Sequence, residues 1–254
     1  MEQSPDQKCD QVVELNSCWL QKSLSTTNDG VIAEVEIPGR PERPVLVHPR
    51  DVPRRKISTT EGFLALIHSI AHIEFNAINL ALDAVYRFRQ MPLQFVSDWL
   101  VVAEEEAKHF SLLKDFLILQ GANYGDFPSH NGLWDMVCKT RFDVLHRMAL
   151  VPRVMEARGL DVTPKMIKRF TQSGEHQAAD IMQVIYDDEI GHVRIGNYWY
   201  QFLCKQREVD PQQTFRDLID LYFQGKLRGP FNWPARIEAG FTETELLMLE
   251  QGLS

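Results

Sequence analysis

The chain has few of the features that mark zinc-knuckle, secreted or nucleic-acid-binding proteins. Its four cysteines, Cys9, Cys18, Cys138 and Cys204, are widely spaced and form no CxxC pair. Neither a zinc knuckle nor a disulfide framework is therefore indicated, and reduced thiols are expected. The formal net charge is −8, which argues against a nonspecific nucleic-acid binder, because such proteins carry an excess of Lys and Arg.

Long apolar runs are also absent from the sequence. No stretch approaches 18 consecutive apolar residues, and the N-terminal segment MEQSPDQKCD is polar. Neither a signal peptide nor a membrane span is expected, and we predict a cytoplasmic protein without a membrane partner. Hydrophobic residues make up 44% of the chain, which is enough to bury a substantial core at this length.

Prolines gather near the N-terminus, and helix formers dominate after residue 57. Residues 37–56 hold five prolines, which forbid a long helix there. SerThrThrGlu at 58–61 resembles a capping box at a helix start. Hydrophobic periodicity then predicts helices at 60–89, 92–120, 130–158 and 164–207, with breaks at Pro92, 121–128 and 159–164.

These patterns predict an all-α protein of three parts. Residues 1–57 form an N-terminal strap, residues 58–207 a ferritin-like antiparallel four-helix bundle, and residues 208–254 a C-terminal helical tail that packs on the bundle. Short connections favour antiparallel neighbours in such a bundle. The tail contains one amphipathic helix after Pro211 and a final short helix begun by Thr242.

Each of the four predicted bundle helices carries ionisable residues inside its apolar stripe. Such a stripe normally faces the core of a helical protein. The interrupting residues, in chain order, are Glu74, Glu106 with His109, Glu156, and Glu189 with His192.

These six residues are the predicted metal ligands. An isolated ionised carboxylate is costly to desolvate, so four glutamates facing one interior require compensating cations. The order is a single Glu, then ExxH, repeated once, with 32 residues from Glu74 to Glu106 and 33 from Glu156 to Glu189. An ExxH pair places both ligands about one helical turn apart on one face, as in di-iron carboxylate bundles. One ExxH often arises by chance on a solvated face, but four carboxylates in apolar stripes argue against that reading.

Four further polar residues have patterns that could be functional, and we interpret them as structural. His68 and His72 form an HxxxH pair, but His72 lies about 200° around the helix from Glu74 and cannot share its site. We interpret both histidines as packing or surface residues. Tyr186 is interpreted as a packing tyrosine rather than a redox-active one, and Arg153 as an ion-pair partner.

Several segments resemble an uncharacterised bacterial family of ferritin-like proteins, catalogued as a domain of unknown function. They are HIEFNAINLA at 72–81, EEAKHF at 105–110, EARGLD at 156–161, DEIGHVRIGNYW at 188–199 and GPFN at 229–232. The resemblance covers most of the chain and implies the ferritin-like fold and its dimetal site. Family members sometimes carry a rhamnosyltransferase-related label, which these motifs do not support, because no Rossmann pattern is visible.

The two-ExxH pattern is also similar to that of tRNA-modifying di-iron hydroxylases, ribonucleotide reductase small subunits and rubrerythrins. The leading hypothesis is a dimetal, most simply di-iron, oxidoreductase that activates O₂ to oxidise or hydroxylate a small-molecule or RNA-borne substrate. Glu74, Glu106, Glu156 and Glu189 would be its catalytic residues. The chain lacks the CxxC pairs of rubrerythrin, so electrons would come from an external donor.

Two other functions stay open on the sequence alone. One is metal handling or ferroxidase-type iron binding without an organic substrate. The other is a manganese-containing oxidase or peroxide scavenger, because carboxylate and imidazole ligands accept iron, manganese or a mixed pair. A homodimer is also compatible with spare apolar surface.

The segment 226–234 combines two cations, Lys226 and Arg228, with the aromatic residues Phe231 and Trp233. One hypothesis makes it a lid over the entrance to the metals, and the alternative makes it a clasp that covers apolar helix surface.

Overall fold

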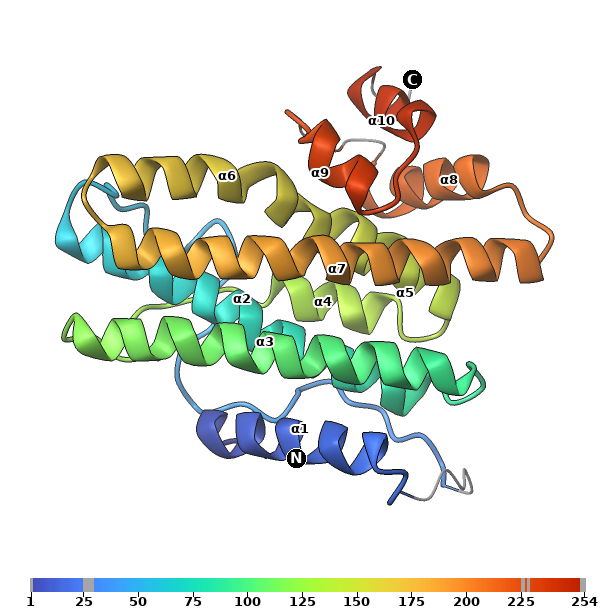
Figure 1. Cartoon of the computed structure of the whole chain (residues 1–254), viewed down its shortest axis with the longest axis horizontal. Coiled ribbons are helices and arrows are strands. Elements are labelled where there is room, and N and C mark those ends of the chain that lie inside the picture. Colours follow the sequence, from blue (N-terminus) through green and yellow to red (C-terminus); the bar gives the residue numbers. More distant parts are fainter. Residues whose placement is uncertain (1, 25–29, 225–226, 228, 252–254) are drawn as a thin grey trace. The chain divides into compact units, whose positions relative to one another are not determined.

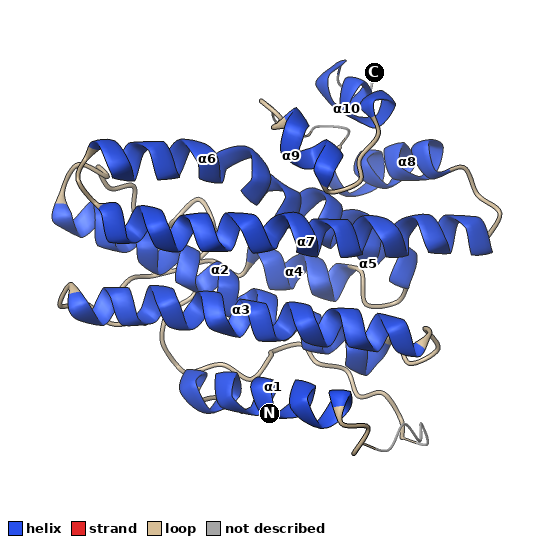
Figure 2. Cartoon of the chain, viewed as in Figure 1, coloured by secondary structure: helices blue, strands red, loops and turns tan. Residues whose placement is uncertain are grey.

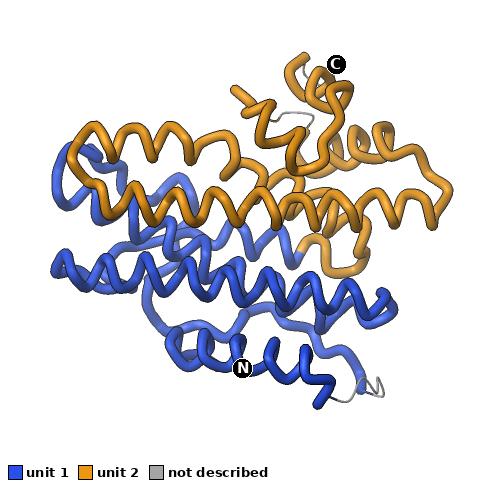
Figure 3. Tube along the Cα trace, in the orientation of Figure 1, with its two compact units in different colours: residues 1–138 blue, residues 139–254 orange. Residues whose placement is uncertain are grey.

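All regular elements of the described chain are helices. The computed structural model describes residues 2–24, 30–224, 227 and 229–251. Within these ranges no strand forms, and only one isolated bridge pairs Leu46 with Ser129 (Figure 2). The all-α prediction is therefore confirmed. The chain divides into two compact units, residues 1–138 and residues 139–254 (Figure 3).

Unit 1 is built on a pair of long helices. They are α2 (Thr60–Arg87) and α3 (Leu93–Leu119), which pack side by side, with α1 (Pro5–Leu20) along α3 (Figure 1). The short helix α4 (Gly132–Lys139) ends this unit. The helices predicted at 60–89 and 92–120 are confirmed. The sixteen-residue helix α1 lies inside the predicted strap, and the sequence pattern missed it.

The start of α2 differs by one residue from the predicted capping box. The cap is Thr59, whose side chain accepts a hydrogen bond from Gly62 N at 3.1 Å. Ser58 is therefore not the cap. Glu61 pairs with Arg55, with 2.9 Å between Oε1 and Nε, and does not reach back to the cap. The helix still begins where a Ser/Thr-rich segment meets an apolar run.

The apolar stripes of α2 and α3 lie in the core, as their spacing predicted. Ile67 and Ile78 on α2, and Val102 and Phe110 on α3, are fully buried. By length and composition α2 could also cross a membrane, with a mean hydropathy of 1.3 over its most apolar window. However, 72% of that window is buried within the protein, as in the core helix of a globular unit.

Unit 2 contains a long helical segment whose hydrogen-bond pattern changes from α-helix to π-helix and back. The helix begins as α5 (Val144–Leu150), widens into the π-helix η1 (Val151–Glu156) and continues as α6 (Ala157–Gln172). It packs against α7 (His176–Gln206) (Figure 1). The tail follows as α8 (Pro211–Phe223), α9 (Trp233–Glu238) and α10 (Glu243–Gln251).

The third and fourth predicted helices, 130–158 and 164–207, had the wrong boundaries. Residues 140–143 interrupt the third predicted helix between α4 and α5. The chain turns at 173–175 rather than at the predicted break 159–164. Gly174 adopts a positive φ of 84°, a conformation that glycine reaches without steric cost. The predicted break instead lies inside α6, with Pro164 in the helix.

A distant residue explains how α6 tolerates Pro164. Proline has no N–H, so the carbonyl four residues earlier loses its helical donor. That carbonyl belongs to Leu160, and it accepts a hydrogen bond from Asn232 Nδ2 at 2.9 Å. Asn232 occupies the N-cap position of the short helix α9, although its side chain makes no capping hydrogen bond there. The tail thus replaces a donor that the local sequence removes, which periodicity alone could not predict.

The π-helix η1 arises where Pro152 interrupts the same long helix. Its last hydrogen bond runs from Ala157 N to Pro152 O, an i→i−5 spacing. Such wide turns are often found at functional sites. Pro152 sits against Gly196 of α7, where an added Cβ would lie 2.2 Å from Pro152 Cβ. Only glycine at position 196 permits this approach of η1 to α7.

Replacing Gly196 by alanine should therefore destabilise unit 2. Forcing a methyl group against the rigid proline ring is expected to cost about 1–3 kcal/mol of unfolding free energy. Urea unfolding of the metal-free protein measures this cost. Gly191→Ala on the same helix is the matched control, because its Cβ would meet nothing within 4 Å, so that variant should be neutral or slightly more stable. Equal stability of both variants would contradict the close packing.

The predicted parts of the tail are partly confirmed. An amphipathic helix after Pro211 and a final helix begun by Thr242 are both present. Thr242 and Glu245 form a true capping box, with Glu245 N to Thr242 Oγ1 at 3.2 Å and Thr242 N to Glu245 Oε2 at 2.8 Å. The domain ranges 1–57, 58–207 and 208–254, and the ferritin-like bundle itself, stay predictions.

Candidate metal centre

Unit 1 holds a buried group of two carboxylates and one imidazole. Glu74 comes from α2, and Glu106 and His109 come from the facing stretch of α3. Their exposed fractions are 5%, 0% and 0%. One ligand atom of each lies within 4.8 Å of the others, so the group could hold a metal ion. Three of the six predicted ligands are thus brought together within this unit.

The imidazole of His109 lies between the two carboxylates. Its Nδ1 is 3.4 Å from Glu74 Oε2 and 3.2 Å from Glu106 Oε2. Burial and the neighbouring charge of Glu106 raise the pKa of Glu74 well above its usual range, although His109 acts in the opposite direction. Glu74 Oε2 accepts no hydrogen bond from any described residue. A cation would offset both charges and give that oxygen a partner.

The chemistry of this group fits a transition-metal ion. Carboxylate oxygens combined with an imidazole nitrogen suit iron, manganese and zinc, whereas calcium and magnesium prefer oxygen alone. An orphaned, buried carboxylate oxygen agrees with this fit, because buried polar atoms are normally hydrogen-bonded.

Unit 2 holds the other three predicted ligands, on η1 and α7. Glu189 and His192 lie one turn apart on α7, with 3.6 Å between Glu189 Oε1 and His192 Nδ1. Glu156 is the last residue of η1, which packs on α7 through the contact of Pro152 with Gly196. All three are buried, with exposed fractions of 9%, 1% and 9% for Glu189, His192 and Glu156.

Burial therefore agrees with the sequence prediction for all six ligands. Each unit carries one single glutamate and one ExxH pair on two packed helical segments. Their joint action as one dimetal site, and the catalytic role of Glu74, Glu106, Glu156 and Glu189, stay predictions.

His68 and His72 are packing residues in the structure, and neither reaches the surface. His72 Nδ1 lies 2.8 Å from Tyr124 Oη, and its Nε2 lies 3.1 Å from Asn76 Nδ2. His68 Nε2 accepts a hydrogen bond from Gly125 N at 2.8 Å, and its ring stacks on Tyr124. These bonds fix the loop after α3 onto α2. The sequence could not show the bonds to Tyr124 and Gly125, because these partners lie more than 50 residues away in the chain.

The burial of His68 predicts an acid-sensitive fold. Burial lowers the pKa of His68 to about 4, against a weaker opposing effect of Asp126. The unfolded state then binds more protons, so this stabilisation is present above pH 6.5 and is lost as the pH falls towards 4. The shift corresponds to about 3 kcal/mol. Unfolding of the metal-free protein at pH 7 and pH 4.5 should show a smaller difference for His68→Gln than for the wild type. An unchanged difference would refute the buried, neutral histidine.

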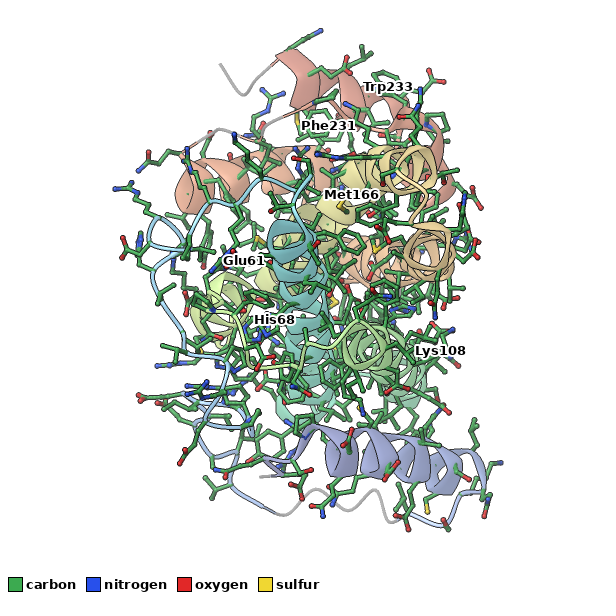
Figure 4. All side chains as sticks on the ribbon, turned by 90° about the vertical axis from the view of Figure 1, so that its left-hand side faces the viewer. Glu61, His68, Lys108, Met166, Phe231 and Trp233 are labelled. Carbon is green, nitrogen blue, oxygen red and sulfur yellow. The ribbon has the colours of Figure 1, made fainter. Side chains whose placement is uncertain are left out.

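The described part of the tail is held to unit 2 by buried ion pairs. Arg236, 2% exposed, binds Asp161 of α6 through two hydrogen bonds of 2.9 and 2.8 Å. Asn232 also donates to the Tyr186 hydroxyl at 3.0 Å. Figure 4 shows Phe231 and Trp233 in this segment. These contacts are those expected of a clasp, and the packing role predicted for Tyr186 agrees with them.

The lid hypothesis depended on residues outside the described ranges. Lys226 and Arg228, the two cations of that hypothesis, are not described. Arg153, predicted as an ion-pair partner, is confirmed as one. It pairs with Glu245 of α10 and lies 4.1 Å from the ring centroids of both Tyr200 and Phe215.

Comparison with known proteins places the chain in a family. A family model described as "Protein of unknown function (DUF455)" matches residues 1–247. The chain belongs to this family. An "Uncharacterized protein" of Haemophilus influenzae (strain ATCC 51907 / DSM 11121 / KW20 / Rd) is 46% identical over 253 residues, covering 96% of this chain and 88% of the relative. No solved structure matches the chain. The description of this family assigns no activity.

Proposed function

We propose that this protein is a ferritin-like dimetal-carboxylate oxidoreductase that uses O₂ to oxidise or hydroxylate a substrate. The observation that carries the proposal is the buried group of Glu74, Glu106 and His109, whose carboxylate charges need a cation. The repeated order of a single Glu and an ExxH pair supports a second metal, bound chiefly by Glu156, Glu189 and His192. Iron is the metal that we favour, with manganese or a mixed pair as alternatives.

The residues of the chain would contribute charge, position and exclusion of water. The six ligands would hold two reduced iron ions, which would supply electrons for O₂ activation, and an external donor would have to replace those electrons. The four glutamates offset the charge of two divalent ions. The apolar side chains of α2 and α3 around the ligands keep the site dry, which strengthens each electrostatic interaction within it and protects reactive species from side reactions.

Anaerobic loading with Fe(II), followed by exposure to O₂, tests this function. We expect about two irons per chain by elemental analysis, a higher melting temperature than for the metal-free protein, and O₂ consumption coupled to a new product in a cell extract containing metabolites and RNA. Continued uptake of iron with no organic product would favour metal handling instead. Activity with manganese alone, on peroxide, would favour a scavenger.

Failure of metal binding would overturn the whole proposal. A loaded wild-type protein that holds no transition metal after gel filtration would show that the buried carboxylates are protonated rather than ligating. A protein that loads two irons but consumes no O₂ would leave the dimetal site standing and remove the oxidase function.

A further inference from the structure

Unit 1 contains a pocket that shares no residue with the candidate metal ligands. Its volume is about 500 Å³, within the range of small-molecule sites in proteins. Residues of α1, of the segment 33–39 and of α2 line the pocket, together with the Trp134 indole of α4. Most of the surface that lines it is apolar, including Val12, Leu15, Val35, Pro38, Leu82 and Trp134.

A buried lysine lies in the wall of this pocket. Lys8 is only 5% exposed, and its Nζ donates hydrogen bonds to Gly39 O and Asn79 Oδ1. Asn79 is held in place because its Nδ2 donates to Phe75 O at 3.0 Å. Both acceptors of Lys8 are neutral. The centroid of the Phe75 ring also lies 4.8 Å from Lys8 Nζ, a weaker attraction for the charge. An ammonium group has three donors, so one remains for an anionic partner.

Among the described residues no carboxylate forms a close ion pair with Lys8, and Glu2 attracts its charge only weakly. Of the acids that line the pocket, Asp83 is bound by Arg87, with 2.8 Å between Oδ1 and Nη2. Glu2 Oε1 accepts a hydrogen bond from Ser4 N at 2.7 Å, and Glu34 is exposed. Burial lowers the pKa of Lys8 to about 8, against weaker effects of Cys9 and Glu2. Leaving a buried charge uncompensated is costly, and a ligand could supply the missing anion.

We propose that this pocket binds a monocarboxylate with an apolar body. Its carboxylate would accept a charge-assisted hydrogen bond from Lys8 Nζ, and its chain or ring would lie against the apolar lining. Lys8 is the only Lys or Arg among the described lining residues, so one anionic group is matched. The carboxylates of Glu2 and Glu34 on the same lining would repel a second anionic group, which disfavours dicarboxylates and phosphates.

Calorimetric titration with three matched probes tests the proposal. The probes are 4-phenylbutyrate, 4-phenylbutanol and the dicarboxylate suberate. The wild-type protein should bind 4-phenylbutyrate about tenfold or more tightly than the alcohol, because the hydrogen bond to a charged group is lost with the alcohol. Suberate should bind more weakly than 4-phenylbutyrate. Equal affinity for the acid and the alcohol, or no binding of either at millimolar concentration, would overturn the proposal.

Three variants locate the binding in this pocket. Lys8→Met keeps an unbranched apolar side chain but removes the charge, and it should lose the preference for the acid while still binding the alcohol. Lys168→Met replaces an exposed lysine in unit 2 and should change nothing. If Lys8→Met does not fold, Leu82→Trp fills the pocket without touching the charge and should abolish binding of both probes. Persistence of the acid preference in Lys8→Met, or of binding in Leu82→Trp, would place the ligand elsewhere.

Discussion

Replacing Glu106 by alanine is expected to reduce the metal content from two ions per chain to at most one. Glu106 is fully buried and lies 3.2 Å from His109 Nδ1, in the same group as Glu74. Its loss removes a ligand as well as the charge that the cation offsets. Affinity should fall by more than about 100-fold, since substitutions beside metal ligands already cost 10–100-fold. Elemental analysis after Fe(II) loading and gel filtration measures the change, and Glu189→Ala should have a similar effect.

The control for this experiment lies on the same helix. Glu104 is a half-buried glutamate of α3 that accepts a hydrogen bond from Asn16 of α1, so it faces a different neighbour. Glu104→Gln should retain both ions. The metal-free Glu106→Ala protein should melt no lower than the metal-free wild type, because one of two repelling carboxylates is gone. Metal that survives both Glu106→Ala and Glu189→Ala, or a wild-type protein that never exceeds one ion, would show that the interior was misread.

Replacing Glu245 by alanine should destabilise unit 2 by about 3–5 kcal/mol, because it strands the fully buried Arg153 without a counter-charge. The two side chains are 1% and 0% exposed. Burial alone would raise the pKa of Glu245, yet Arg153 and Thr242 hold it below its usual range, so the carboxylate is ionised at neutral pH. Denaturant unfolding gives the loss. Hydrogen exchange should show opening of α10 and of η1, since Arg153 belongs to η1.

Two companion variants separate the ion pair from other effects. Glu243→Ala, at an exposed position of α10, should change stability by less than about 0.5 kcal/mol. Glu245→Gln keeps a polar group at the capping box with Thr242 but removes the charge, so it should lose less than Glu245→Ala. A Glu245→Ala protein as stable as Glu243→Ala would mean that Arg153 finds another partner or leaves the core.

The Arg153–Glu245 ion pair also helps to position Glu156, a candidate metal ligand of unit 2. Arg153 and Glu156 lie in the same six-residue π-helix, three residues apart. Arg236 and Asn232 hold the tail to α6, and Gly196 admits Pro152 against α7. Together these contacts fix the segment that carries Glu156. The tail is thus tied to the geometry of a candidate ligand, whether or not it also covers an entrance.

The apolar periodicity of the sequence predicted those helices whose formation depends on residues close together in the chain. Helices α2 and α3 were placed within about two residues, because an apolar residue every three or four positions specifies a buried helical face. The same periodicity located all six candidate ligands, since a glutamate or histidine inside an apolar stripe is directed into the core. Each of the six is buried in the structure.

The sequence by itself determined the all-helical class and predicted the burial of the six candidate ligands, and only the tertiary structure decided the limits of α5, η1 and α6 and the burial of Lys8. Pro164 predicts a helix break from local sequence, yet α6 continues through it. Asn232, 72 residues from Leu160, donates the hydrogen bond to Leu160 O that the proline cannot. Lys8 belongs to a polar segment of the sequence, yet it is buried and donates a hydrogen bond to Asn79, 71 residues away. Hydrogen bonds between distant residues change the cost of a proline or a buried charge, and no local pattern records their partners.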